Sequence, residues 1–333
     1  QIWVHPAVRV GPSLLGGRGL FAAGPLHAGE VLLRVPLAAA LGAPAAGAAE
    51  AWLRRAVGAA EGLLGCSEVG GSCPLDWSVL RLAGLLFFEA AVAQQRSQWT
   101  EYVCSLPSPT DMDAILTPSG RLLPSLEAAT RTLGGAARGL AVTVQRIAGA
   151  LRTAAGLEVG VQQSACGNST RRGERLARLA EWAARTVLSR GLALACGEAG
   201  LQAMVPAWDL VNHGVKDGNV AERSDQDTCE SLVYASRPIG PGVELLYDYT
   251  GGDGWQCEEW ALRHGFVPAE VAAEVAAAGV APPAAATGLA GAPPPWRRRV
   301  LAEPGRWRRA ARLLGSDIAD RPRSAAAALR RCV

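Results

Sequence analysis

Two stretches of strand-like sequence lie far apart in this chain of 333 residues, on either side of a long region with helical character. Residues 14–36 combine glycine and proline turn signals with the apolar run 31–35, which Pro36 ends. Residues 192–250 are again a succession of short apolar runs and turns. Because strands must pair to satisfy their backbone groups, the two stretches have to meet in space. This layout predicts an α+β fold and argues against an alternating parallel one.

The region between them, about 45–189, reads as a large helical insertion. From Trp77 to Gln95 the apolar residues recur at spacings of three and four, which is the helix period. The same pattern is clearest from Leu176 to Val187, and it ends before Gly191. Further helices are expected at 50–64, about 122–133 and 138–155.

The last part of the chain differs in composition. A short helix is expected at 258–264, and the Ala/Pro/Gly-rich residues 269–295 read as a linker. Residues 296–333 hold 11 Arg against 3 acidic residues, a balance of +8, so that the other residues sum to −5 of the total +3. Such a basic segment is typical of proteins that bind an acidic partner or nucleic acid. It is also expected from Arg-rich coding, because the whole chain has a single lysine, Lys216.

Cysteine usage and hydropathy narrow the class of protein. The 8 cysteines form no C-x-x-C pair and no zinc-site spacing, so we expect reduced thiols and no bound metal. No apolar run of about 18 residues is present, which argues against a membrane-spanning helix. The chain starts with neither Met nor a signal-peptide pattern, so a processed form or a fragment is expected. We expect an intracellular protein, with chloroplast, cytoplasm and nucleus left open.

Three short motifs contain the residues suited to chemistry. Gly17-Arg18-Gly19 allows a close approach of the backbone to a ligand, but it does not satisfy the dinucleotide-binding pattern. Asn212-His213 offers donors and acceptors in fixed planes. Tyr247 and Tyr249, two residues apart after a turn, could line an aromatic channel suited to a cationic amine. Each motif alone has an ordinary structural explanation: a turn, a core histidine or an edge strand.

The order of these motifs resembles the SET-domain methyltransferases, and within them the Rubisco large-subunit methyltransferase subgroup, which is related to the actin-histidine methyltransferase. Three further blocks are similar to that subgroup: Trp99 to Pro107, Glu181 to Arg190, and His264-Gly265-Phe266. The resemblance covers residues 14–268. It implies a SET-domain β-clip fold over 1–268, with core segments 14–36 and 190–268 and the helical insertion at about 45–189. The short helical segment 296–333 would be part of a substrate-binding domain.

The resemblance also implies a cofactor, S-adenosylmethionine (AdoMet), and roles for particular residues. The backbone at Arg18 and Gly19 would face the methionine part, and Arg190 would pair with its carboxylate. Asn212 and His213 would hold the amino group and the adenine. In addition, Phe266 would stack near the adenine.

The same resemblance implies that Tyr249 is the catalytic phenol beside the transferred methyl group, with Tyr247 and His264 in the substrate channel. The predicted activity is methylation of a lysine side chain of a protein by a monomer that requires neither DNA nor a membrane. His264 stands where the Rubisco-type enzymes have tyrosine, so histidine N-methylation remains an alternative. A catalytically weak SET-like module that binds a protein is another.

Overall fold

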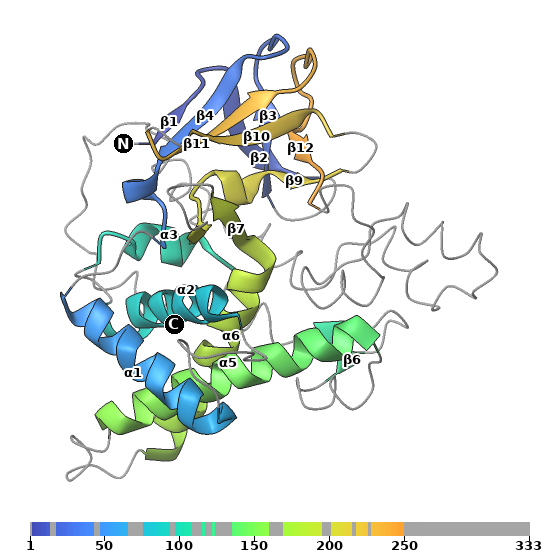
Figure 1. Cartoon of the computed structure of the whole chain (residues 1–333). Helices are drawn as coiled ribbons and strands as arrows, with labels where there is room; N and C mark the ends of the chain where they lie inside the picture. Colours follow the sequence, from blue (N-terminus) through green and yellow to red (C-terminus); the bar gives the residue numbers. More distant parts are fainter. Residues whose placement is uncertain are drawn as a thin grey trace.

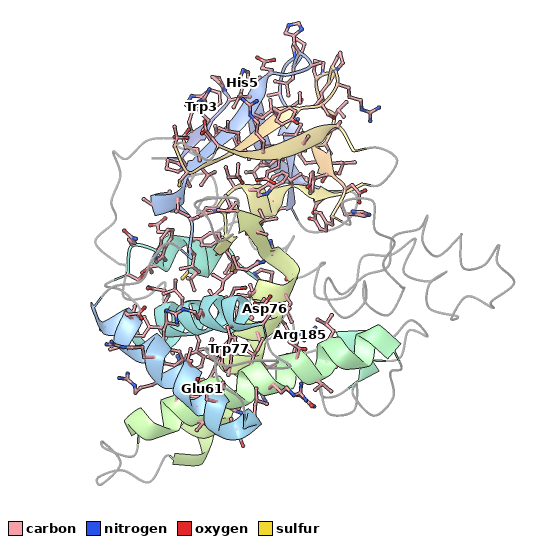
Figure 2. All side chains as sticks on the ribbon, viewed as in Figure 1. Trp3, His5, Glu61, Asp76, Trp77 and Arg185 are labelled. Carbon is pink, nitrogen blue, oxygen red and sulfur yellow. The ribbon has the colours of Figure 1, made fainter. Side chains whose placement is uncertain are left out.

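The computed structural model describes residues 2–13, 18–42, 47–65, 76–93, 97–107, 115–116, 122–123, 135–159, 169–194, 201–214, 218–225 and 228–249. In this part of the chain, a layer of strands lies on one side and a layer of helices on the other (Figure 1). Trp3 and His5 mark the strand layer, and Asp76, Trp77 and Arg185 mark the helical layer (Figure 2).

The largest sheet joins the two distant strand-like stretches, as the sequence predicted. Its order is β1-β4-β11-β10, with antiparallel pairing throughout. The pairing of β4 with β11 places Val35 opposite Ser231 and Arg34 opposite Leu232. The strands are β1 (Trp3–Val4), β4 (Val31–Pro36), β10 (Val220–Asp225) and β11 (Glu230–Ala235).

Smaller strand pairs surround this sheet and shape the site described below. One is antiparallel, β2 (Val8–Pro12) with β3 (Arg18–Ala22), and another is parallel, β9 (Asn212–His213) with β12 (Leu246–Tyr247). An antiparallel bridge between Phe21 and Glu244 holds the two pairs together. The other pairs are β5 (Ile115–Leu116) with β6 (Leu122–Leu123), and β7 (Gly191–Leu194) with β8 (Leu201–Met204).

The helical insertion consists of α1 (Gly47–Leu64), α2 (Trp77–Phe88), α3 (Thr100–Ser105), α5 (Gly135–Val159) and α6 (Ser169–Arg190). Asp76 caps α2, because its carboxylate accepts from the backbone N–H groups of Ser78 at 2.9 Å and Val79 at 3.4 Å. A π-helical turn, Glu89–Ala93, follows α2, and short 3₁₀ turns cover Leu37–Ala39 and Trp208–Leu210.

Each layer has its own apolar core. Trp52, Leu86, Leu151 and Val187 are among the buried residues of the helical core, whereas Leu33 belongs to the strand core. Burial of one such side chain stabilises the fold by about 1.5–3 kcal/mol. Helix α6 ends at Arg190 and β7 begins at the next residue, so the C-terminal end of α6 lies beside the strand layer (Figure 1).

Most of the predicted elements are confirmed, with two corrections. The helix expected at 122–133 is wrong at its start, where Leu122 and Leu123 form β6; a short apolar run does not by itself separate helix from strand. The expectation of reduced thiols is wrong for Cys229, which is disulfide-bonded. Gly17 and everything expected beyond Tyr249, including the helix 258–264, the linker and the segment 296–333, lie outside the described residues.

Candidate active site

The Gly17-Arg18-Gly19 and Asn212-His213 motifs meet at the carboxylate of Glu244, a residue that lies three positions before Tyr247. The Asn212 amide Nδ2 donates to Glu244 Oε1 at 2.7 Å and to the backbone carbonyl of Arg18 at 2.9 Å. The second oxygen, Glu244 Oε2, accepts from the hydroxyl of the buried Ser13 at 3.0 Å. The first two motifs therefore share a single hydrogen-bonded cluster with Glu244.

Gly19 belongs to this cluster because it leaves room for it. A Cβ atom at Gly19 would lie 2.1 Å from Glu244 Oε1 and 2.9 Å from Asn212 Nδ2. Contacts below 3 Å of this kind essentially never occur, so no larger residue fits unless the cluster moves. The glycine is required for the close approach of β3 to Glu244.

Asn219 holds the strand that follows Glu244 in register. Its side-chain Nδ2 donates to the Glu244 carbonyl at 2.8 Å, and its Oδ1 accepts from the Leu246 N–H at 2.9 Å. Its own backbone N–H donates to the Leu246 carbonyl at 2.9 Å. The buried Asn219 thus bonds the backbone from Glu244 to Leu246 much as a neighbouring strand would.

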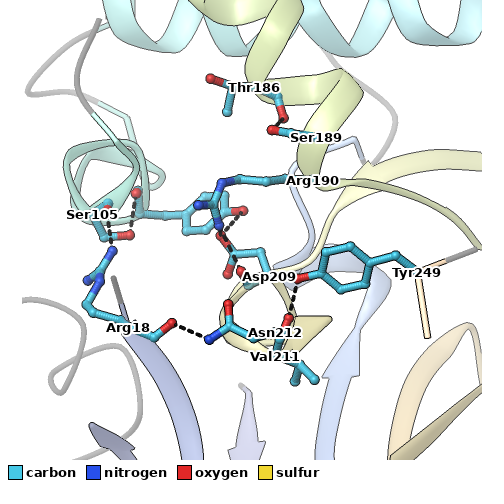
Figure 3. Close-up of polar contacts among 10 residues, drawn as sticks. Arg18, Ser105, Thr186, Ser189, Arg190, Asp209, Val211, Asn212 and Tyr249 are labelled. Atoms are coloured by element: carbon cyan, nitrogen blue, oxygen red, sulfur yellow. Dashed lines mark hydrogen bonds and ion pairs between the residues drawn. The ribbon is translucent and has the colours of Figure 1, made fainter. Parts of the chain in front are cut away.

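A second polar cluster connects the end of α6 to the strand layer (Figure 3). Arg190 Nη1 donates to the Asp209 carbonyl at 2.8 Å and lies 3.3 Å from its carboxylate Oδ2. The Tyr102 hydroxyl, from α3, donates to the same Oδ2 at 3.3 Å. Arg18 reaches the same helix, since its Nη2 donates to the Ser105 carbonyl.

Burial dominates the electrostatics of this second cluster. The Asp209 side chain is only 4% exposed and that of Arg190 25% exposed. Desolvation raises the pKa of Asp209 above its usual range, and the charges of Arg190 and Arg18 partly offset this. Burial, with the nearby Asp209 charge, raises the pKa of Tyr102 well above its ordinary value, so this phenol stays neutral.

The backbone is strained just before Asp209. Ala207 has φ +70°, a left-handed value that is uncommon for any residue with a Cβ. Such strain costs on the order of 1–3 kcal/mol and tends to occur at functional sites. Here it lets the 3₁₀ turn Trp208–Leu210 carry Asp209 to the end of α6.

Tyr249 and His213 form the other side of the site. The Tyr249 hydroxyl donates to the Val211 carbonyl at 2.6 Å, and its backbone N–H donates to His213 Nδ1 at 3.2 Å. The two rings lie 5.2 Å apart. Because Nδ1 accepts a hydrogen bond, the neutral imidazole carries its proton on Nε2.

Tyr247 lies near this group but has different neighbours. Its ring packs edge-on against the buried Trp208, with centroids 4.9 Å apart. Burial raises the pKa of its phenol, and the carboxylates of Glu222 and Asp248 add to the effect. The strand β12 ends at Tyr247, so Tyr249 lies just beyond the strand.

The predicted site residues within the described part of the chain therefore lie together, whereas His264 and Phe266 fall outside it. Asn212 bonds the Arg18 carbonyl, and Arg190 joins them through the segment Asp209–Asn212 (Figure 3). Gly19 lies so close to Asn212 that a Cβ atom would be 2.9 Å from its Nδ2. Sequence reasoning gave no role to Asp209, Asn219 or Ser13. The only available signal for Asp209 was its position three residues before Asn212. The roles of Asn219 and Ser13 depend on contacts with Glu244, which the sequence does not reveal.

Comparisons with known proteins identify the family. The SET-domain model matches residues 17–250, which is most of the chain, and the chain belongs to the SET-domain family. SET domains are typically AdoMet-dependent protein-lysine methyltransferases. A comparison with curated protein sequences finds no match.

Solved structures with a similar fold are distant relatives. One is Rubisco LSMT bound to AdoMet, with 18% identity and a TM-score of 0.47, covering 78% of this chain and 52% of that one. Another is the SET domain of LSMT bound to MeLysine and AdoHcy, with 18% identity and a TM-score of 0.48, covering 80% and 54%. The chain thus spans about half the length of these proteins.

Two further observations hold for the described ranges only. They contain no group of three or more His, Cys, Asp or Glu residues able to hold a metal ion. None of their helices combines the length and the apolar character needed to cross a membrane.

Proposed function

We propose that this chain is an AdoMet-dependent protein N-methyltransferase that acts on a lysine side chain. The observation that carries the proposal is the meeting of Asn212, Arg190 and Tyr249 around the segment Asp209–Asn212 (Figure 3). Gly19 leaves the space that this meeting requires. A single site thereby offers a hydrogen-bond acceptor, a cation and a phenol.

The groups left over at this site suit the methionine end of AdoMet. Both contacts of Arg190 to Asp209 use Nη1, so among the described residues its Nη2 and Nε donors remain for a carboxylate. Asn212 uses Nδ2 for its internal contacts, which leaves Oδ1 for an ammonium group. AdoMet would supply a methyl group on a sulfonium, a species that a neutral amine can attack directly.

The residues of the chain would then position the acceptor amine. A lysine amine has a pKa of about 10.4 and must lose its proton to water before it attacks. Aromatic surroundings such as Trp208 and Tyr247 favour the neutral amine through desolvation. The Tyr249 hydroxyl donates a hydrogen bond to the Val211 carbonyl, so its oxygen can accept a hydrogen bond from the amine and orient the nitrogen lone pair.

Calorimetric titration of the full chain with AdoMet tests the first half of this proposal. Saturable binding that weakens at least tenfold in Arg190→Leu is expected, because the cation for the carboxylate is lost. A chain that binds no AdoMet would be a SET-like module without the enzyme's cofactor site. Mass spectrometry of a methylated protein substrate would then distinguish lysine from histidine as the acceptor.

A further inference from the structure

The orientation of the Asn212 amide is fixed by two acceptors from different parts of the chain. Its two N–H bonds point to the Arg18 carbonyl on β3 and to the Glu244 carboxylate after β11. Neither partner can donate at these atoms, so the reversed amide would lose both hydrogen bonds and place oxygen against oxygen. The amide oxygen therefore lies on the side of Asp209 and Arg190 (Figure 3).

Glu244 is itself held in place on several sides. Ser13 donates to its outer oxygen, and Asn219 donates to its backbone carbonyl. The absence of a side chain at Gly19 provides the space for its carboxylate. This arrangement costs the partial burial of a carboxylate, whose Oε1 accepts a hydrogen bond from the side-chain amide of Asn212.

We propose that Glu244 is a positioning residue that makes Asn212 an obligate hydrogen-bond acceptor, so that the site selects ligands carrying an α-ammonium group. This inference rests on the proposed AdoMet site. An ammonium group has only donors, so it matches an amide oxygen and is mismatched with an amide NH₂. The negative charge of Glu244, one hydrogen bond behind Asn212, favours a cation further.

Two ligands separate this role from a general contribution to stability. The first is S-adenosylhomocysteine (AdoHcy), and the second is its analogue with hydrogen in place of the α-amino group, 5′-S-(3-carboxypropyl)-5′-thioadenosine. Calorimetry on the full chain should show that AdoHcy binds about tenfold or more tightly than the deamino analogue, as one charge-assisted hydrogen bond requires.

The variants address Glu244 directly. Glu244→Met keeps the approximate side-chain volume but removes the acceptor for Asn212. The ratio of the affinity for AdoHcy to that for the deamino analogue should fall by about tenfold, and the affinity for the deamino analogue should change by less than about threefold. Glu244→Gln can still accept from Asn212 through Oε1 and donate to Ser13, so it should keep most of the preference. Glu230→Gln, at the start of β11 and facing Arg34, is the matched control and should match the wild type.

The outcomes distinguish this inference from the function on which it rests. Equal weakening of both ligands in Glu244→Met would assign the residue a purely structural role and overturn the inference. Equal binding of both ligands to the wild type would also overturn it, with AdoHcy binding still supporting the proposed function. Absence of AdoHcy binding to the wild type would contradict both.

A second variant applies if Glu244→Met does not fold. Ser13→Ala removes one donor from the Glu244 carboxylate and leaves the rest of the cluster in place. The ratio of the affinity for AdoHcy to that for the deamino analogue should fall by about threefold, because the lost hydrogen bond holds Glu244 and does not touch the ligand. An unchanged preference in a folded Ser13→Ala protein would count against the positioning role.

Discussion

Gly19→Ala is the substitution for which the structure gives the clearest expectation. The added Cβ would lie 2.1 Å from Glu244 Oε1, and this oxygen cannot move aside easily because Asn212 and Ser13 hold the carboxylate. Relief of the overlap requires either a shift of β3 or rupture of the bond between Glu244 and Asn212. Overpacking costs about 1–3 kcal/mol, and a hydrogen bond to a charged group contributes about 1.5–3 kcal/mol.

The free energy of unfolding of Gly19→Ala should therefore fall by about 1–3 kcal/mol in urea denaturation, whichever route relieves the overlap. AdoMet binding should weaken at the same time, because Asn212 loses its fixed orientation. Gly58→Ala is the matched control: this glycine lies within α1 and a Cβ there meets no atom within 4 Å. It should raise the free energy of unfolding by up to about 1 kcal/mol.

The reasoning is refuted if Gly19→Ala unfolds within about 0.5 kcal/mol of the wild type, the range of ordinary surface changes. A second check combines Gly19→Ala with Glu244→Ala. If the two residues compete for the same space, the double variant should lose less stability than the sum of the single variants. Additive losses would mean that the overlap is relieved elsewhere.

The remaining predictions concern the other residues of the site. Tyr249→Phe removes only the hydroxyl, which bonds the Val211 carbonyl and would orient the acceptor amine. The variant should therefore lose most turnover in a methyl-transfer assay and retain AdoMet binding; full activity would contradict the catalytic role. Tyr102→Phe should lower the free energy of unfolding by about 1 kcal/mol, measured in urea, because a buried acceptor on Asp209 loses a donor; no loss would mean that this 3.3 Å contact is energetically unimportant. The pKa of Asp209 is raised in the folded state, so as the pH falls from about 7 to 4 the folded protein binds this proton before the unfolded chain does. The free energy of unfolding of the wild type should therefore rise relative to that of Asp209→Asn over this range. A difference that stays flat or falls would contradict this sign.

Sequence patterns predicted the parts of the fold that depend on local periodicity. The predicted face of α6 is buried from Leu179 to Val187 and partly buried at Leu176, and the run 31–35 forms β4. The pairing of the first strand-like stretch with the last was predicted from the need to satisfy backbone groups, and β4 with β11 confirms it. The start of the helix expected at 122–133 failed because two apolar residues carry too little periodicity.

The candidate site was predictable only as a set of motifs. Arg18, Gly19 and Asn212 were expected near one another, and they are in contact. The sequence could not reveal why Gly19 is needed, since the atom that excludes a side chain belongs to Glu244, more than two hundred residues later. Nor could it reveal that Asp209 binds Arg190, because that ion pair depends on the strained turn at Ala207.

The central claim is that the three motifs form a site for methyl transfer from AdoMet to a protein side chain. It is tested most directly by incubating the full chain and its Tyr249→Phe variant with methyl-labelled AdoMet and a cell extract. The modified residue is then located by mass spectrometry. We predict label on a lysine Nζ of a protein with the wild type, and little or none with Tyr249→Phe. Absence of transfer by a wild-type chain that binds AdoMet, or equal transfer by both proteins, would contradict the account.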